Sequence, residues 1–188
     1  MGLVHIYCGD GKGKTSAAVG LAVRAAGCGK RVVIARFLKT DNSGEVEILK
    51  KIPEVTLIPC RKTFGFVRSM DEETKRECAA YHRELFGEAV KLAERADLVV
   101  FDEIMAAVNH GMVPERDVLE FLENRPGRDQ TDGLEIVLTG RDPSEKLIAA
   151  ADYVSEICKR KHPFDRGIMA RRGVEYCSLL FKSSNSFY

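Results

Sequence analysis

The 188-residue sequence has almost no excess of either charge, no long apolar run and no closely paired cysteines. Its 29 basic and 28 acidic residues leave a formal net charge of +1. A protein specialised for nucleic acid carries a strongly basic surface, so this balance argues against that class. The chain also lacks both the ~18 uninterrupted apolar residues of a membrane span and the basic start of a secretory signal. We therefore expect a cytoplasmic protein without a nucleic-acid or membrane partner.

The six cysteines are scattered singly along the chain, and none belongs to a CxxC pair. Isolated thiols in a chain without a secretion signal are typical of a reduced protein. We expect free and mostly buried thiols, which excludes a disulfide framework and a zinc cage.

The length and the composition indicate one domain with a sizeable core, because 45% of the residues are hydrophobic and 30% are charged. We expect this domain to cover residues 1–181, followed by a frayed tail over residues 182–188. The chain shows no internal repeat and no linker rich in Pro, Gly or Ser.

Short apolar runs alternate with helical patterns, which predicts an α/β fold with a parallel sheet covered by helices on both faces. In such sheets the ligand crevice lies at the carboxyl ends of the strands. The glycine-containing loops 39–44 and 62–70 should therefore border that crevice. The expected strands are residues 3–8, 31–37, 55–60, 98–102, 134–139 and 153–158, and the expected helices are residues 14–27, 71–96 and 113–124.

The strongest motif lies between the first strand and the first helix and matches the phosphate-loop pattern GxxxxGK[ST], except that Cys8 replaces the first glycine. Its glycines allow backbone N–H groups to surround phosphate oxygens at a helix N-terminus. Lys14 supplies a positive charge, and the Thr15 hydroxyl can bind Mg²⁺. The motif predicts a P-loop NTPase-like (RecA-like) fold. The expected nucleotide-binding residues are Gly9, Asp10, Gly11, Lys12, Gly13, Lys14, Thr15 and Ser16.

Asp102 and Glu103 end the apolar strand 98–102 and form the second half of a nucleotide site. A carboxylate at this position can hold Mg²⁺ directly or through water, since Mg²⁺ prefers oxygen ligands. The alternative is a helix-capping role for the aspartate. The spacing leaves open which of the two carboxylates reaches the metal.

These motifs alone do not decide what the nucleotide is used for. The chain has no NKxD element of the kind that GTPases use to bind the base. An ordinary ATP hydrolase or kinase and a nucleotide-binding regulator both remain compatible with the phosphate loop. Arg141 follows the strand 134–139, where the crevice lies, and is a candidate nucleotide contact.

Several further segments occur in the same order as in the P-loop ATP:corrinoid adenosyltransferase family, which the chain resembles over nearly its whole length. The phosphate loop is shared with many NTPases, whereas its combination with Thr-Gly-Arg and Lys-His-Pro-Phe is much more specific. The resembling segments are residues 9–18, 24–27, 37–39, 64–66, 102–103, 138–141, 161–164 with Gly167, and 173–176.

The resemblance implies an activity that composition could not reveal. Members transfer the 5′-deoxyadenosyl group of ATP to the Co(I) of a reduced corrinoid and release triphosphate, in the synthesis or salvage of adenosylcobalamin. It implies ATP and Mg²⁺ as cofactors, a corrinoid substrate, a flavoprotein reductase as electron donor, and a homodimer. Members also bind ATP with its phosphates reversed relative to ordinary P-loop hydrolases. The alternatives are a binding-only regulator or corrinoid chaperone, and an ordinary hydrolase or kinase.

The resemblance also assigns roles to individual residues. Lys14 and the loop match the triphosphate site, and Thr15 with Glu103 matches the Mg²⁺ ligands. Arg24 matches a phosphate-contacting arginine, although without the family it would be interpreted as a solvated helix residue. Phe64 and Phe66 match paired aromatics that pack on the corrin and displace its lower axial ligand. The second aromatic of the family is a tryptophan, which Phe66 replaces here.

Overall fold

The computed structural model describes residues 2–128 and 132–175, and its core is a six-stranded sheet in the order β3-β2-β4-β5-β1-β6. Every neighbouring pair of strands is parallel, which confirms the predicted α/β class. The predicted frayed tail, 182–188, lies outside the described residues. The strands are β1 (Val4–Cys8), β2 (Val32–Arg36), β3 (Val55–Leu57), β4 (Leu98–Asp102), β5 (Glu135–Thr139) and β6 (Tyr153–Glu156).

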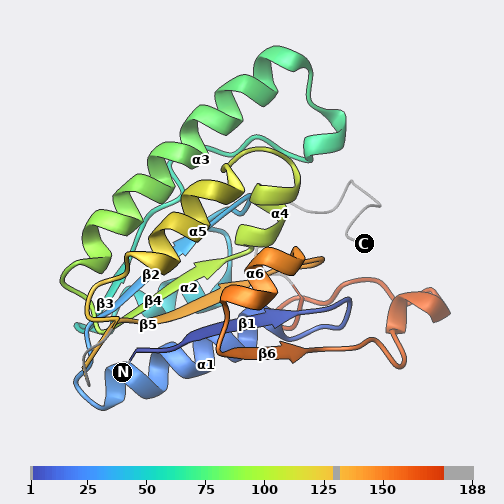
Figure 1. Cartoon of the computed structure of the whole chain (residues 1–188). Coiled ribbons are helices and arrows are strands. Elements are labelled where there is room, and N and C mark those ends of the chain that lie inside the picture. The colour runs from blue at the N-terminus through green and yellow to red at the C-terminus, as the bar shows by residue number, and fades with distance from the viewer. Residues whose placement is uncertain (1, 129–131, 176–188) are drawn as a thin grey trace.

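Helices cover both faces of the sheet, with α1 on one side and α3 and α5 on the other (Figure 1). All strands point the same way, so the loops that follow them gather at one edge. The helices are α1 (Lys14–Gly27), α2 (Gly44–Leu49), α3 (Glu72–Ala93), α4 (Ile104–Asn109), α5 (Glu115–Glu123) and α6 (Glu145–Ala150), with short 3-10 helices η1 (Val67–Ser69) and η2 (Pro163–Arg166).

The small side chains of α1 allow it to lie close to the sheet. Ala18, Ala22 and Ala26 recur every four residues and are buried, so they form one stripe of the helix. They belong to the same buried cluster as Val100 and Val137 of the central strands. This packing fixes the start of α1, and therefore the phosphate loop, relative to β4 and β5.

The opposite face holds most of the core. The predicted stripe of α3 is confirmed, because all six of its members are buried: Cys78, His82, Leu85, Phe86, Ala89 and Ala93. The helix begins after Asp71, whose side chain accepts a hydrogen bond of 2.7 Å from the Thr74 N–H. This interaction satisfies one of the free N–H groups at a helix start.

The sequence patterns missed the short helices α2, α4 and α6. α4 lacks the alternation of apolar and polar residues by which an amphipathic helix is recognised in a sequence. Three of its residues, Ile104, Met105 and Ala107, are buried. The prediction that a helix starts at residue 113 was wrong by two residues. Pro114 is extended at the N-cap of α5, and a proline disfavours helical geometry in the residue before it.

The five cysteines among the described residues are free thiols, as predicted, but they are less buried than predicted. Cys8 and Cys78 are buried and Cys60 is partly buried. Cys28 and Cys158 are exposed, because one caps the end of α1 and the other lies beyond the edge strand β6. Within the described ranges, the longest helices are too polar to cross a bilayer.

Phe101 is the centre of the core on the α3 side, and its replacement tests this packing. Its fully buried ring lies 5.4 Å from Phe86 and 5.5 Å from Phe121, between ring centroids. We expect Phe101→Ala to lower the free energy of unfolding by about 3–5 kcal/mol, measured by urea denaturation. Ile48→Ala is the control, since Ile48 is 59% exposed. Equal losses in the two variants would contradict this description of the core.

Candidate active site

The phosphate loop follows β1 and packs against the segment after β6 (Figure 1). The Gly11 N–H donates a 2.7 Å hydrogen bond to the Ile157 carbonyl. A Cβ atom on Gly9 or Gly11 would lie 2.5 Å from that carbonyl oxygen, so neither position accepts a side chain without movement. Gly13 has φ 124°, a conformation that side-chain-bearing residues rarely adopt. Gly9 and Gly11 are therefore required by the close approach of Ile157, and Gly13 by its backbone conformation.

Lys14 lies over the phosphate loop with its side chain almost fully buried. Its Nζ donates hydrogen bonds of 2.8 Å to the carbonyls of Gly9 and Gly11. Burial lowers the pKa of Lys14, and the positive charge of Arg141 lowers it further, while Glu103 acts in the opposite direction. A cation held in this low-dielectric position interacts strongly with an arriving phosphate.

Asp102 is the buried carboxylate at the centre of the site. It is 2% exposed and is the last residue of the apolar strand β4. One oxygen accepts hydrogen bonds from the hydroxyls of Thr15 at 3.0 Å and Thr139 at 2.7 Å. The other oxygen accepts a 2.5 Å hydrogen bond from Lys39 Nζ. β4 is thereby joined to α1, to β5 and to the loop after β2.

Thr139, the last residue of β5, holds the two acidic residues at the end of β4. β5 lies between β1 and β4 in the sheet, so Asp102 is not on a strand adjacent to the one that leads into the phosphate loop. The Thr139 hydroxyl donates to Asp102 and accepts a 2.8 Å hydrogen bond from the Glu103 N–H. It therefore fixes both acidic residues at the end of β4.

Glu103 has an unusual backbone. Its φ of 62° and ψ of 25° are left-handed, at the start of α4, and such a conformation is uncommon for a residue other than glycine. Among the described residues, 2–128 and 132–175, no hydrogen bond to the Glu103 carboxylate is found. The negative charge of this carboxylate raises the pKa of Lys14. This carboxylate therefore lies near the phosphate loop, whereas that of Asp102 contacts Thr15 directly.

The oxygen atoms of Thr15 and Asp102 suit Mg²⁺, because they are hard ligands that already surround a cation, the ammonium of Lys39. In the described part of the chain, no three His, Cys, Asp or Glu side chains form a metal-binding cluster. Mg²⁺ usually takes one or two protein carboxylates and completes its shell with water and substrate phosphates. The donor set fits a metal shared with a nucleotide.

The remaining loop residues are more exposed. Asp10 accepts a 2.8 Å hydrogen bond from the Lys159 N–H, which lowers the pKa of Asp10. Lys12 forms an ion pair of 2.7 Å with Glu175. Ser16 is exposed on the first turn of α1, and Arg141 is exposed after β5. The C-terminal part of the described chain thus contacts the phosphate loop.

The carboxylate of Glu175 is held by two cations. Arg171 donates hydrogen bonds to it, and Lys12 adds its ion pair. Together they lower the pKa of Glu175 to about 2, with the Arg171 contribution the larger. Glu175 therefore stays ionised beside the phosphate loop over the whole physiological pH range.

Arg24 does not lie near the phosphate loop within one chain. It is exposed in the last turn of α1, and the ten residues that separate it from Lys14 span about 15 Å at the helical rise. The contact between Arg24 and a phosphate stays a prediction. The position of Arg24 relative to the phosphate loop of the same chain does not account for it.

Phe64 and Phe66 lie in the loop before α3 but differ in exposure. The Phe64 ring packs 5.7 Å from Tyr81 and 6.3 Å from His82, between centroids. Phe66 is 51% exposed, and Gly65 between them has φ 78°. Phe66 is therefore available to a ligand, while Phe64 also contributes to the core.

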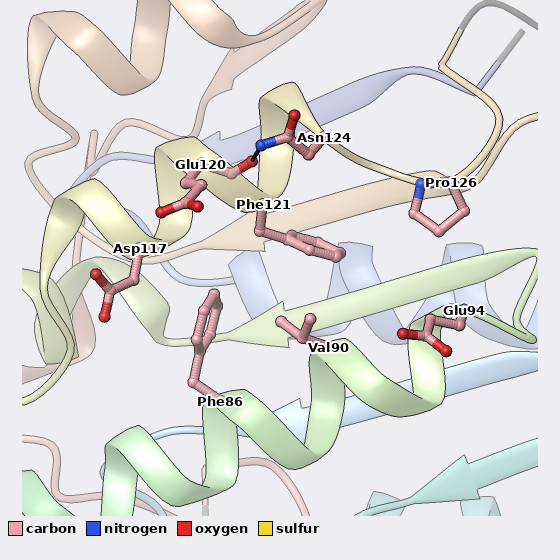
Figure 2. Close-up of a pocket in the computed structure, with 8 residues that line it drawn as sticks. All are labelled: Phe86, Val90, Glu94, Asp117, Glu120, Phe121, Asn124 and Pro126. Carbon is pink, nitrogen blue, oxygen red and sulfur yellow. Dashed lines mark hydrogen bonds between the residues drawn. The ribbon is translucent and has the colours of Figure 1, made fainter.

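A groove of about 390 Å³ between α3 and α5 lies elsewhere (Figure 2). It is bordered by the second half of α3 and by α5 from its first turn to its C-cap, and it includes no residue of the phosphate loop. Acidic side chains surround its apolar floor and would repel phosphate. The lining residues are Phe86, Val90, Glu94, Asp117, Glu120, Phe121, Asn124 and Pro126.

Comparison with known proteins agrees with the site. The model of a family described as ATP:corrinoid adenosyltransferase BtuR/CobO/CobP matches residues 1–176. The chain belongs to this family. The match includes the phosphate loop, Asp102 and the loops that carry Lys39 and Phe64.

Curated members of the family are similar over most of their length. The corrinoid adenosyltransferase of Escherichia coli K12 is 35% identical over 93% of this chain and 86% of its own. The Salmonella typhimurium LT2 protein, corrinoid adenosyltransferase CobA, is 34% identical over the same shares. The corrinoid adenosyltransferase of Pseudomonas aeruginosa PAO1 is 32% identical over 93% of this chain and 84% of its own.

The sequence analysis did not identify Lys39 and Thr139 as site residues, although both form hydrogen bonds with Asp102. Lys39 was noted only within the segment 37–39, and Thr139 only within Thr-Gly-Arg. The signal that could have identified them is position, since Thr139 ends β5 and Lys39 follows β2 at the carboxyl edge of the sheet. Their contacts with Asp102 depend on strand order, which no local pattern contains.

His82 supplies a pH-dependent test of the packing beneath Phe64. It is 3% exposed, and within the described residues its buried Nδ1 has no hydrogen-bond partner. Burial lowers the pKa of His82 to about 4, whereas an unfolded histidine titrates near 6.5. The unfolded chain therefore binds the proton more readily, so stability is full above pH 6.5 and falls as the pH decreases toward 4.

We expect the free energy of unfolding to fall by about 2 kcal/mol between pH 7 and pH 5 through His82. His82→Phe should lack this component, since it keeps a ring but cannot titrate. Urea denaturation of both proteins at the two pH values measures the difference, because the contributions of other groups cancel. Parallel pH profiles would contradict a buried, neutral imidazole.

Proposed function

We propose that this protein transfers the 5′-deoxyadenosyl group of ATP to the Co(I) of a reduced corrinoid and releases triphosphate. The observation that carries the proposal is the phosphate loop joined to Asp102 through Thr15 in a chain that belongs to this family. In the reaction, cobalt attacks C5′ of the ribose. The cobalt–carbon bond forms, the C5′–oxygen bond breaks, and its electron pair leaves on the triphosphate.

The chain's own groups match the charge that develops on the departing triphosphate. The phosphate loop leads directly into the N-terminus of α1, which favours anions. Lys14 and Arg141 are close enough for their charges to influence each other, so both face the same region. Fixed positive groups of this kind stabilise the transition state more than the bound substrate.

Mg²⁺ is part of the proposal, and Thr15, Asp102 and Glu103 are the residues that would hold it. When bound, it supplies positive charge to the phosphate oxygens of the leaving group. The residues orient that charge: Thr139 holds both acids in place, and α1 holds Thr15.

The corrinoid is proposed to lie against the loop that carries Phe64 and Phe66. Phe66 is half exposed and offers an apolar surface, while Phe64 is anchored on α3 by Tyr81. Exclusion of the lower axial ligand would leave four-coordinate Co(II), which is easier to reduce. A flavoprotein reductase as electron donor and a homodimer belong to the same proposal and follow from the family resemblance.

Lys14→Ala tests the role of the loop. We expect transfer to fall by roughly 100-fold or more, on the order of 3 kcal/mol in the transition state, because one positive group facing the leaving group is lost. Product formation is followed anaerobically from ATP, Mg²⁺ and chemically reduced cobalamin, together with identification of the released phosphate species. Triphosphate should appear in equal amounts with adenosylcobalamin.

The exposed Lys30 provides the matched control, and Lys30→Ala should retain normal transfer. Near-normal turnover of Lys14→Ala at saturating ATP would overturn the assignment of the loop. Release of orthophosphate without corrinoid, at a rate comparable to turnover, would favour an ordinary hydrolase instead.

Phe64→Ala and Phe66→Ala test the corrinoid surface. Both should slow adenosylation from cob(II)alamin with a biological reductant and retain much more activity with chemically prepared cob(I)alamin, which bypasses the reduction. The loss should be smaller for Phe66, since its ring is smaller than the tryptophan it replaces and less apolar area would leave the interface. Circular dichroism confirms folding, which matters most for Phe64 because of its core contacts. Equal losses with both electron sources would remove the axial-ligand role.

A further inference from the structure

Lys39 already occupies the position between the two predicted metal ligands. Its Nζ lies 2.8 Å from Thr15 Oγ1 and 2.5 Å from Asp102 Oδ2. Its side chain is 28% exposed, whereas that of Asp102 is 2% exposed. The ammonium therefore neutralises a carboxylate that water hardly reaches, which would otherwise be a costly buried charge.

The backbone around Lys39 is built to hold it there. Leu38 has a φ of 52°, a left-handed backbone conformation that is strained for leucine. The Phe37 N–H donates a 2.9 Å hydrogen bond to the Asp102 carbonyl, so the loop leaves β2 directly beside Asp102. A tight turn at this point directs Lys39 back over the end of β4.

A buried arginine fixes the other side of this turn. Arg36 is 3% exposed, and its guanidinium donates a 2.8 Å hydrogen bond to the Thr40 carbonyl. It also forms an ion pair with Asp41, which accepts a hydrogen bond from the Cys60 N–H. The residues that flank Lys39 are thus held by charged contacts. Within the described residues, the hydrogen bonds of the Lys39 side chain go to the oxygens of Thr15 and Asp102.

We propose that Lys39 is a tethered cation that competes with the divalent metal for Thr15 and Asp102. It neutralises Asp102 when the metal is absent, and the metal must displace it to bind. This inference rests on the metal site of the proposed function. In the metal-free site the ammonium is also within electrostatic range of the phosphate loop, because its charge lowers the pKa of Lys14. Metal alone should bind weakly, and the nucleotide phosphates should make the exchange favourable.

Mn²⁺ serves as the probe, and its affinity for the full chain without nucleotide or corrinoid is measured by electron paramagnetic resonance. Lys39→Met should bind Mn²⁺ at least about tenfold more tightly than the unmodified protein, because a competing unit charge is removed. Lys39→Arg keeps the charge and should bind as weakly as the unmodified protein. Lys91→Met removes an equal charge from the exposed last turn of α3 and should change nothing.

Adding Asp102→Asn to Lys39→Met should abolish the gain, which assigns the gain to this carboxylate. An unchanged or weaker Mn²⁺ affinity of a folded Lys39→Met would overturn the proposal, as would an equal gain in Lys91→Met. If Lys39→Met does not fold, Lys39→Gln provides the same comparison with a polar side chain. Because no ATP or corrinoid is present, the result is independent of whether the protein transfers an adenosyl group.

Discussion

A carboxylate buried at the end of a strand is stable only when hydrogen bonds or opposite charges surround it. Asp102 meets this requirement with three partners from three different segments: Thr15 on α1, Thr139 on β5 and Lys39 after β2. The same requirement therefore aligns the phosphate loop, the central strands and the positive charge of Lys39. The chemistry proposed for the site depends on this one buried charge.

Strand order explains why the arrangement needs Thr139. β5 separates the strand that leads into the phosphate loop from the strand that ends in Asp102. Thr139 at the end of β5 fixes both acids of β4, while Thr15 reaches Asp102 directly. The C-terminal segment closes the other side, where Gly9 and Gly11 accept the close approach of Ile157. Together these contacts hold the phosphate loop between two parts of the chain that are distant in sequence.

The sequence predicted what depends on local patterns. The phosphate loop, the buried stripe of α3 and the apolar run of β4 each carry a signal within a few residues, and each was confirmed as a structural element. The short buried helix α4 carries no such period. The role of Lys39 could not be predicted either, because it depends on the left-handed Leu38 and on the neighbouring strand. Arg24 matched a family motif, and its distance from the loop already follows from the predicted helix 14–27, which the structure confirms as α1.

The central claim is that the buried carboxylate of Asp102 couples the metal to the nucleotide. The most direct measurement is the affinity for ATP with and without Mg²⁺, in the unmodified protein and in Asp102→Asn, which keeps the shape and removes the charge. We expect Mg²⁺ to tighten ATP binding in the unmodified protein and to have little effect in the variant. An Asp102→Asn protein that keeps the full gain in affinity from Mg²⁺ would contradict the account.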